Sequence, residues 1–254
     1  MEYYGQYGQD VIIYEFFRKK GIRDGIFIDV GALDGLRFSN TYLLEQNGWS
    51  GICIEAHPSY IEILKSNRPN SECYSVAAGD ENKMTTIRLN YRGSLTTLDF
   101  QKAAEWESET DGLGRYLGNS GKKEINGFKN GSHEIEMRTI DSIIEESTER
   151  KDRPINLISI DIDGSEKYAF KGLDLNRWKP DLLVLEHTIV GKDFLYEYAE
   201  SFGYIFAKSR GSDTFFVHNE TDKTIVKSIP LPPEHGKVTP KHIAGREEGK
   251  NIPD

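Results

Sequence analysis

The hydrophobic positions of this chain fall into short buried runs, separated by amphipathic stretches and turn residues. The run from Ile26 to Val30 is closed by Gly31, which is typical of a buried parallel strand that enters a tight loop. Similar runs predict further strands over residues 52–55, 72–76, 84–89, 133–138, 155–160 and 181–185. Apolar positions at helical spacing predict helices over residues 9–20, 39–46, 58–65, 139–146, 165–171 and 192–202.

Strands and helices alternate along most of the chain, and the pattern ends differently. Residues 204–207 and 214–218 form two short runs separated by polar residues, which indicates a closing hairpin. An alternating series followed by a hairpin predicts an α/β fold. We expect a doubly wound sheet, mostly parallel, whose last strand runs antiparallel.

One long segment, residues 92–132, breaks this regular pattern. It is rich in Gly, Ser, Asn and charged residues and shows little periodicity, apart from a possible short helix near 99–107. Such a segment is typical of a lid or a binding loop inserted into a domain. We therefore expect one domain over residues 1–228 with this insertion, followed by a Pro-rich tail over residues 229–254.

The loop from Asp29 to Gly35 carries the strongest functional signal. Open α/β sheets bind ligands at the carboxyl ends of their strands, where this loop is expected. The loop lacks the G-x-G-x-x-G spacing of dinucleotide sites, and Asp29 and Asp34 would repel a phosphate. An acidic glycine loop suits a positively charged cofactor instead, and the sulfonium and ammonium of S-adenosylmethionine fit that description.

Glu55 ends the second predicted strand and gives a second signal. In nucleoside-binding α/β folds an acid at this place accepts hydrogen bonds from the ribose hydroxyls. Taken alone, Asp29 or Glu55 is equally well explained as a cap of the helix that follows it. Their combination at this spacing favours the cofactor site.

Four ionisable residues follow the fourth and fifth core strands: Asp161 and Asp163, then Glu186 and His187. Parallel strands end at one edge of the sheet, and strand alternation would put Asp161 and Asp163 on one side of the chain. Asp161, Glu186 and His187 are candidate ligands of Mg²⁺ or Mn²⁺, which leaves Asp163 as a general base for a hydroxyl, with His187 as the next candidate. The alternative is that the carboxylates form turns and caps and that the strand end is merely hydrogen-bonded.

Composition narrows the class of protein. The 254 residues are 37% hydrophobic and 29% charged, as in an ordinary soluble protein, and the net charge of −9 argues against a nucleic-acid-binding face.

No apolar run is long enough to span a membrane, and residues 1–6 lack the regions of a signal peptide. The two cysteines, Cys53 and Cys73, fall in predicted strands as core residues, so we expect a cytoplasmic protein. The oligomeric state stays open.

Taken together, the motifs resemble the FkbM family of S-adenosylmethionine-dependent methyltransferases. The resemblance extends from about Gly8 to Val217. Its segments are Gly8-Gln9-Asp10, Asp29-Val30-Gly31-Ala32-Leu33-Asp34-Gly35, Phe38-Ser39-Asn40-Thr41, Gly48-Trp49-Ser50-Gly51-Ile52-Cys53-Ile54-Glu55 and Ser159-Ile160-Asp161-Ile162-Asp163-Gly164-Ser165-Glu166.

The resemblance implies a Rossmann-like methyltransferase fold with a seven-stranded mixed sheet. It also implies O-methylation of a hydroxyl on a sugar or natural product, so the expected partner is a carbohydrate or small-molecule acceptor. The cofactor contacts that it implies are Asp29, Gly31, Ser39 and Glu55, with Asp80 near the adenine. The acidic loop itself adds Asp34 and Gly35.

The sequence departs from the family pattern in a few places. The family usually has Asn where this chain has Leu33, Glu where it has Asp163, and often an amide where it has His187. The Asp161-x-Asp163 and Glu186-His187 pattern also looks like that of magnesium-dependent sugar O-methyltransferases, with His187 replacing an acid.

Two other functions stay open at this point. A nucleotide-dependent dehydrogenase can use the same fold, but the missing glycine fingerprint counts against it. A non-catalytic family member could act as a binding or trafficking module. The retained acids Asp29, Glu55 and Asp161 count against that alternative.

Overall fold

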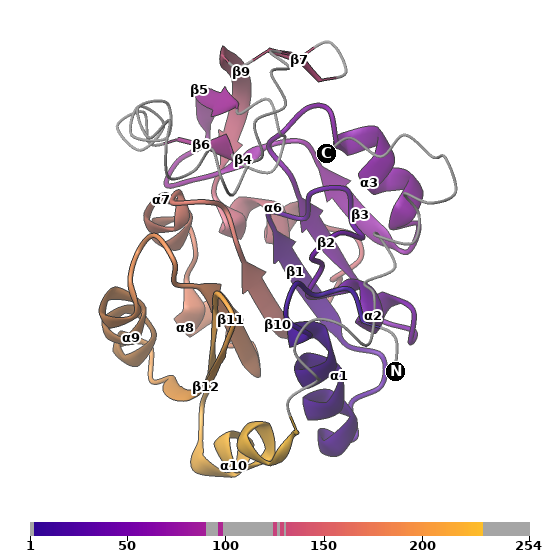
Figure 1. Ribbon diagram of the computed structural model, residues 1–254, viewed down its shortest axis with the longest axis vertical. Coiled ribbons are helices and arrows are strands. Elements are labelled where there is room, and N and C mark those ends of the chain that lie inside the picture. Colours follow the sequence, from indigo (N-terminus) through magenta and orange to yellow (C-terminus); the bar gives the residue numbers. More distant parts are fainter. Residues whose placement is uncertain (1–2, 90–95, 99–123, 126–127, 130, 231–254) are drawn as a thin grey trace.

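The computed structural model describes residues 3–89, 96–98, 124–125, 128–129 and 131–230 (Figure 1). The helices in this part of the chain are α1 (Gln9–Lys20), α2 (Tyr42–Glu45), α3 (Ile61–Asn67), α6 (Ile140–Glu146), α7 (Glu166–Lys171), α8 (Leu175–Trp178), α9 (Lys192–Ser201) and α10 (Glu220–Ser228). The strands of the main sheet are β1 (Ile26–Val30), β2 (Ser50–Ile54), β3 (Ser71–Tyr74), β10 (Ile155–Ile160), β11 (Leu182–Glu186), β12 (Ile205–Arg210) and β13 (Asp213–Val217).

The main sheet has seven strands in the order β12-β13-β11-β10-β1-β2-β3. β3, β2, β1, β10 and β11 pair in parallel, whereas β13 runs antiparallel to both β11 and β12. The predicted seven-stranded mixed sheet with an antiparallel last strand is therefore confirmed. The carboxyl ends of β1, β2, β10 and β11 lie at one edge, and β13 begins at that same edge.

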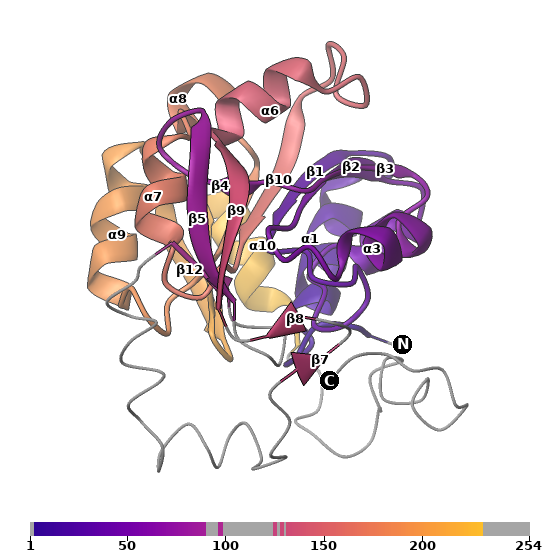
Figure 2. The ribbon, with the colours of Figure 1, turned by 90° about the horizontal axis from the view of Figure 1, so that it is seen from above.

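Helices cover both faces of the sheet (Figure 2). Side chains alternate along each strand, so Ile26 and Ile28 of β1 pack on the face covered by α6, α7, α8 and α9. Phe27 points to the opposite face, where α1, α2, α3 and α10 pack. We call this second face the α1 face. Asp29 shares its side of β1 with Phe27 and therefore lies on the α1 face.

A smaller sheet lies beside the main one, in the order β4-β9-β5-β6. It contains β4 (Ala77–Ala78), β5 (Lys83–Leu89), β6 (Thr96–Thr97) and β9 (Gly131–Arg138). β5 and β9 are the strands predicted over 84–89 and 133–138, and they pair antiparallel along their length. Their apolar side chains, including Ile87 and Ile135, pack against Ala56 just after β2. A further strand pair is β7 (Glu124–Ile125) with β8 (Phe128–Lys129).

The structure differs from the predicted elements in a few places. Helices α8 and α10 were not predicted. Most of the predicted insertion over 92–132, including the helix near 99–107, lies outside the described residues, as does the tail from residue 231. In the described part of the chain, no helix combines the length and hydropathy that a membrane span requires.

Candidate functional site

The loop that follows β1 lies tightly between two neighbouring strand ends. The N–H groups of Gly31 and Ala32 donate to the carbonyl oxygen of Ile54 at 2.9 and 3.1 Å. Gly31 has φ 90°, and a Cβ built on it would lie 1.8 Å from the carbonyl oxygen of Asp161. Only glycine combines this backbone angle with so close an approach. Gly31 therefore brings the loop of residues 29–35, which we call the cofactor loop after its predicted role, against Asp161 just after β10.

Asp34 shapes the loop from within. Its Oδ1 accepts hydrogen bonds from the N–H groups of Leu36 and Arg37 at 2.9 and 2.8 Å, and its Oδ2 accepts from Nε of Arg37 at 2.8 Å. The side chains of Asp34 and Arg37 are both almost fully buried. These bonds use both carboxylate oxygens of Asp34 to hold the turn.

Ser39 and Gly35 play similar structural parts. Oγ of Ser39 accepts from the N–H groups of Thr41 and Tyr42 at 3.2 and 3.0 Å, where α2 begins. Gly35 has φ 82°, and a Cβ there would lie 2.6 Å from Cγ of Arg68. The predicted cofactor residues Gly31, Asp34, Gly35 and Ser39 thus form one compact loop. Their contacts with a cofactor stay a prediction.

Glu55 joins the end of β2 to this loop. Its two carboxylate oxygens accept hydrogen bonds from the N–H groups of Leu33 at 2.8 Å and His57 at 2.6 Å. Each oxygen keeps a second lone pair that can accept a ribose hydroxyl. Burial raises the pKa of Glu55 to about 7. Asp80, predicted near the adenine, follows β4 of the smaller sheet and makes no hydrogen bond with the loop among the described residues.

Arg68, at the end of α3, supplies the positive charge that compensates Asp29. It is fully buried, with Nε 2.6 Å from Oε2 of Glu45 and Nη1 3.7 Å from Oδ2 of Asp29. Its Nη2 donates to the hydroxyl of Thr41, which in turn donates to Asp29. Arg68 therefore balances two buried carboxylates and fixes the Asp29 side chain at the end of β1.

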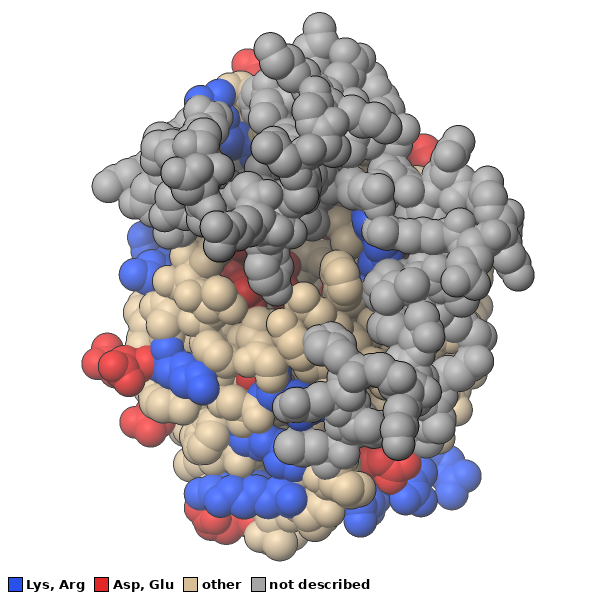
Figure 3. All heavy atoms as spheres, viewed as in Figure 1, with Lys and Arg blue, Asp and Glu red and all other residues tan. Residues whose placement is uncertain are grey.

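Three acids form a row across the edge of the sheet. β10 and β11 pair Ile160 with Leu185, so the following residues, Asp161 and Glu186, lie level with each other. β11 and β13 pair Glu186 directly with Asp213. We call Asp161, Glu186 and Asp213 the acidic row. Glu186 and Asp213 share the α1 face with Asp29, and all three are buried. On the face of the molecule in Figure 3, acidic and basic side chains are scattered among other residues.

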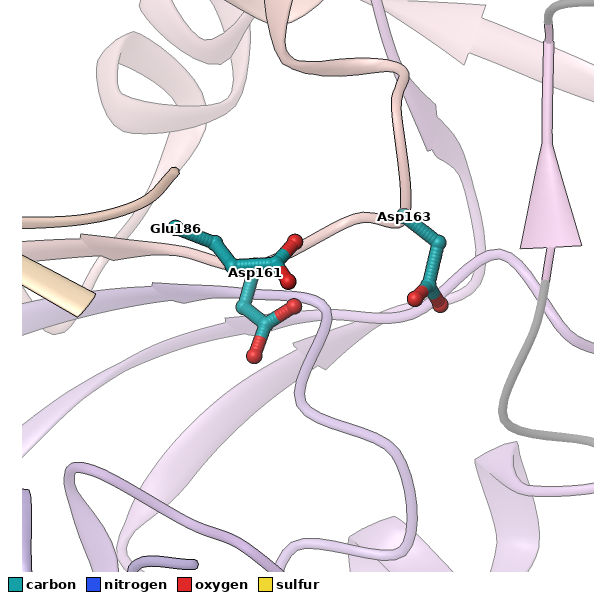
Figure 4. A group of neighbouring side chains, drawn as sticks. All are labelled: Asp161, Asp163 and Glu186. Carbon is teal, nitrogen blue, oxygen red and sulfur yellow. The ribbon is translucent and has the colours of Figure 1, made fainter. Parts of the chain in front are cut away.

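Asp163 faces this row from the loop after β10. Single ligand atoms of Asp161, Asp163 and Glu186 all lie within 4.8 Å of one another, and their carboxylates gather in Figure 4. His187 lies outside this group. It follows Glu186 directly, and alternation sends it to the opposite face, where its Nδ1 lies 3.0 Å from Oγ1 of Thr214. The sequence suggested His187 as the third candidate ligand beside Asp161 and Glu186. The structure brings Asp163 to that place instead.

Strand alternation does not explain how Asp161 and Asp163 come together. β10 ends at Ile160, and Asp163 has φ 50° in the turn that follows. Glu166 closes this turn, because its Oε1 accepts from the N–H groups of Ile162 and Gly164 at 3.2 Å each. Asp161 and Asp163 do lie together, but strand alternation, on which the prediction was based, is not the reason. A left-handed turn, not the pleat, brings Asp163 toward the row.

The acidic row has no positive partner in the part of the chain that the structure describes. The pKa of Asp161 is raised to about 6 and that of Asp213 to about 7, mainly by burial and in part by the charge of neighbouring carboxylates. Burial, with the charge of Asp161, also raises the pKa of Glu186. A site of this kind is stabilised by a cation. The residues present therefore fit a positively charged cofactor.

Sequence reasoning missed several residues of this site. Arg68 reads as a surface residue at the end of an amphipathic helix, and nothing in the local pattern reveals its burial. Asp213 reads as a turn residue of the hairpin. Gln9 and Asn40 stood out in the sequence only as parts of longer motifs. In the structure, Nε2 of Gln9 donates to Oδ2 of Asp213 at 2.6 Å, and Nδ2 of Asn40 donates to Oγ of Ser159 at 3.1 Å.

The fold is similar to solved methyltransferases at low sequence identity. A TehB-like SAM-dependent methyltransferase from Corynebacterium glutamicum is 14% identical, with a TM-score of 0.39 over 84% of this chain and 85% of that chain. Precorrin-6y C5,15-methyltransferase from Geobacter metallireducens is 12% identical, with a TM-score of 0.37 over 82% and 85%. Magnesium protoporphyrin IX methyltransferase from Synechocystis, solved with bound SAM, is 9% identical, with a TM-score of 0.38 over 83% and 79%.

The family comparison is more specific. The chain matches no curated protein sequence. The model of the methyltransferase FkbM domain, in contrast, matches residues 29–227, which is most of the chain. The match covers the cofactor loop, Glu55, Asp163 and the acidic row, and it confirms the resemblance that the motifs indicated. This chain belongs to the FkbM family of methyltransferases.

Proposed function

We propose that this protein transfers the methyl group of S-adenosylmethionine to a hydroxyl of a sugar or glycan. The observation that carries the proposal is the set of carboxylates at one sheet edge. Glu55 stands at the end of β2, and the acidic row stands beside the cofactor loop without a described positive partner. A nucleoside cofactor matches both features if its ribose lies at Glu55 and its positively charged end lies at the acidic row.

The cofactor would be held mainly through its ends. Glu55 would accept hydrogen bonds from the ribose, because both of its oxygens keep an acceptor position. The imidazole of His57, beside it, is neutral, because burial lowers its pKa to about 4. The loop after β1 would lie along the cofactor as Gly31 allows. When bound, the cofactor supplies a methyl group on a sulfonium, which is electrophilic.

The acceptor hydroxyl must lose its proton as its oxygen attacks that methyl group. A positioned carboxylate or imidazole takes such a proton. Asp163 is our candidate, because it lies next to the acidic row on a turn rather than inside the sheet. His187 is the second candidate. Its pKa is lowered by burial and by the charge of Lys192, so the ring is neutral and can accept a proton at neutral pH.

The neighbouring carboxylates also favour a second arrangement, in which they bind a divalent cation. Asp161, Asp163 and Glu186 offer hard oxygen ligands within 4.8 Å of one another, and Oε2 of Glu186 is buried without a hydrogen-bond partner among the described residues. Mg²⁺ or Mn²⁺ held there would lower the pKa of a bound hydroxyl. Asp163 would then be a ligand of the cation rather than the base.

The choice of a carbohydrate acceptor draws its support from the family and from one exposed aromatic residue. Phe38 is 43% exposed and has φ 57°, an angle that bulky residues rarely adopt. Strained, exposed residues next to a site often serve binding. Its ring offers an apolar face to the C–H face of a sugar.

The proposal is tested by methyl transfer from labelled S-adenosylmethionine to a panel of sugars, glycans and small phenols. We expect label in a sugar fraction, and product analysis should place it on oxygen. The variant Asp163→Asn should lose most turnover while its affinity for the cofactor stays within about twofold. Transfer to phenols alone would contradict the carbohydrate assignment. Full activity of Asp163→Asn would move the base to His187.

A further inference from the structure

Among the residues that the structure describes, three buried acceptor oxygens near the acidic row have no hydrogen-bond donor. They are Oδ1 of Asn40, Oε2 of Glu186 and Oδ1 of Asp213. Their residues are 6%, 8% and 1% exposed. Leaving a buried acceptor without a donor is costly, so three such atoms in one region call for an explanation.

The three residues come from different elements but lie near one another at the edge of the sheet. Glu186 and Asp213 are direct partners in the antiparallel pair of β11 and β13, where opposed side chains lie close together. The amide of Asn40 lies near enough to Asp213 to lower the pKa of that carboxyl group. Asn40 also donates to Ser159, which lies on β10 two residues before Asp161. The group therefore sits at the carboxyl edge, on the α1 face.

The start of α1 closes this place from the side. Nε2 of Gln9 donates to Oδ2 of Asp213 at 2.6 Å, so that oxygen is satisfied and Oδ1 is left over. Gln9 is 2% exposed. The arrangement holds the Asp213 carboxylate in one orientation, as expected of a side chain that is set up for a ligand.

We propose that Asn40, Glu186 and Asp213 bind the ammonium group at the amino-acid end of the cofactor. A primary ammonium has three N–H donors and one positive charge, which match three acceptor oxygens and the excess negative charge. The sulfonium has no N–H donor and would leave these oxygens unsatisfied. The inference rests on the proposed function, since it takes S-adenosylmethionine as the cofactor. Glu186 has a second oxygen, so it can still face a metal.

The test compares ligands with and without the amino-acid end. S-adenosylhomocysteine carries the ammonium and no sulfonium, and 5′-methylthioadenosine lacks the whole amino-acid part. Calorimetry should show that Asp213→Asn weakens binding of S-adenosylhomocysteine by roughly ten- to hundredfold, as expected for a lost charge-assisted bond. Binding of 5′-methylthioadenosine should change less than about twofold. The control Glu55→Gln should weaken both ligands equally.

A second variant, Asn40→Ala, covers the case in which Asp213→Asn does not fold, and circular dichroism checks both. It should show the same selective loss for S-adenosylhomocysteine. Equal binding of S-adenosylhomocysteine to the wild type and to a folded variant would overturn the ammonium site, as would an equal loss for both ligands. If the wild type bound neither ligand, the proposed function itself would fail, which is a distinct result.

Discussion

Leu33 donates its backbone N–H to the Glu55 carboxylate at 2.8 Å, and this bond joins the loop after β1 to the end of β2. Leu33 does so with φ 53°, in the left-handed region. The two features that indicated a cofactor site in the sequence are thus in direct contact. The loop and Glu55 therefore form one structural unit.

The buried Glu55 makes stability depend on pH. Its pKa is raised by burial from 4.5 to about 7, so its favourable contribution is complete below pH 4.5 and is lost as pH rises through 7. In the protein without ligand, the ionisation of Glu55 should lower the free energy of unfolding by up to roughly 3 kcal/mol between about pH 5 and pH 8. Denaturant titrations of the wild type and Glu55→Gln measure the difference. Identical pH profiles would show that Glu55 ionises normally.

Leu33→Asn should stabilise the free protein. Asn adopts the left-handed region more easily than Leu, so the gain should approach about 1 kcal/mol, less the packing lost with the half-buried side chain. Leu36→Asn is the matched control, because Leu36 lies in the same loop without a left-handed angle and should show no gain. A thermal shift for Leu33→Asn no higher than for that control would argue against backbone strain at this position.

Arg68→Met should be strongly destabilising. The change leaves the carboxylates of Asp29 and Glu45 buried without their cation, which costs about 3–5 kcal/mol. Adding Glu45→Met should restore part of the loss. The exposed Lys65, on the same helix, serves as control, and Lys65→Met should change stability by less than about 0.5 kcal/mol. A cost for Arg68→Met as small as that of the control would contradict the proposed charge balance.

The sequence predicted the parts of this site that depend on periodic patterns. The run closed by Gly31 and the acid Glu55 stand at strand ends, where hydrophobic periodicity and turn residues are both visible. Asp213 could not be recognised, because its role depends on pairing with Glu186 across an antiparallel ladder. Nor could the grouping around Asp163 be worked out correctly, since a left-handed turn replaced the expected pleat.

Treatment with EDTA separates the two arrangements proposed for proton removal. If Asp161, Asp163 and Glu186 hold a divalent cation, chelation should abolish methyl transfer, and Mg²⁺ or Mn²⁺ should restore it. The variant Glu186→Gln should then need a higher metal concentration for half-maximal activity. Activity that survives chelation, with no metal found by mass spectrometry, would exclude the cation and leave Asp163 or His187 as the base.

The central claim is that the edge of the sheet carrying Glu55, Asp29 and the acidic row binds S-adenosylmethionine. A calorimetric titration of the wild-type protein with S-adenosylmethionine tests it most directly. We predict one site per chain, with affinity lowered by roughly ten- to hundredfold in Glu55→Ala, which loses one or two charge-assisted hydrogen bonds. Binding weaker than about 1 mM to the folded wild type, or equal binding to Glu55→Ala, would contradict the account.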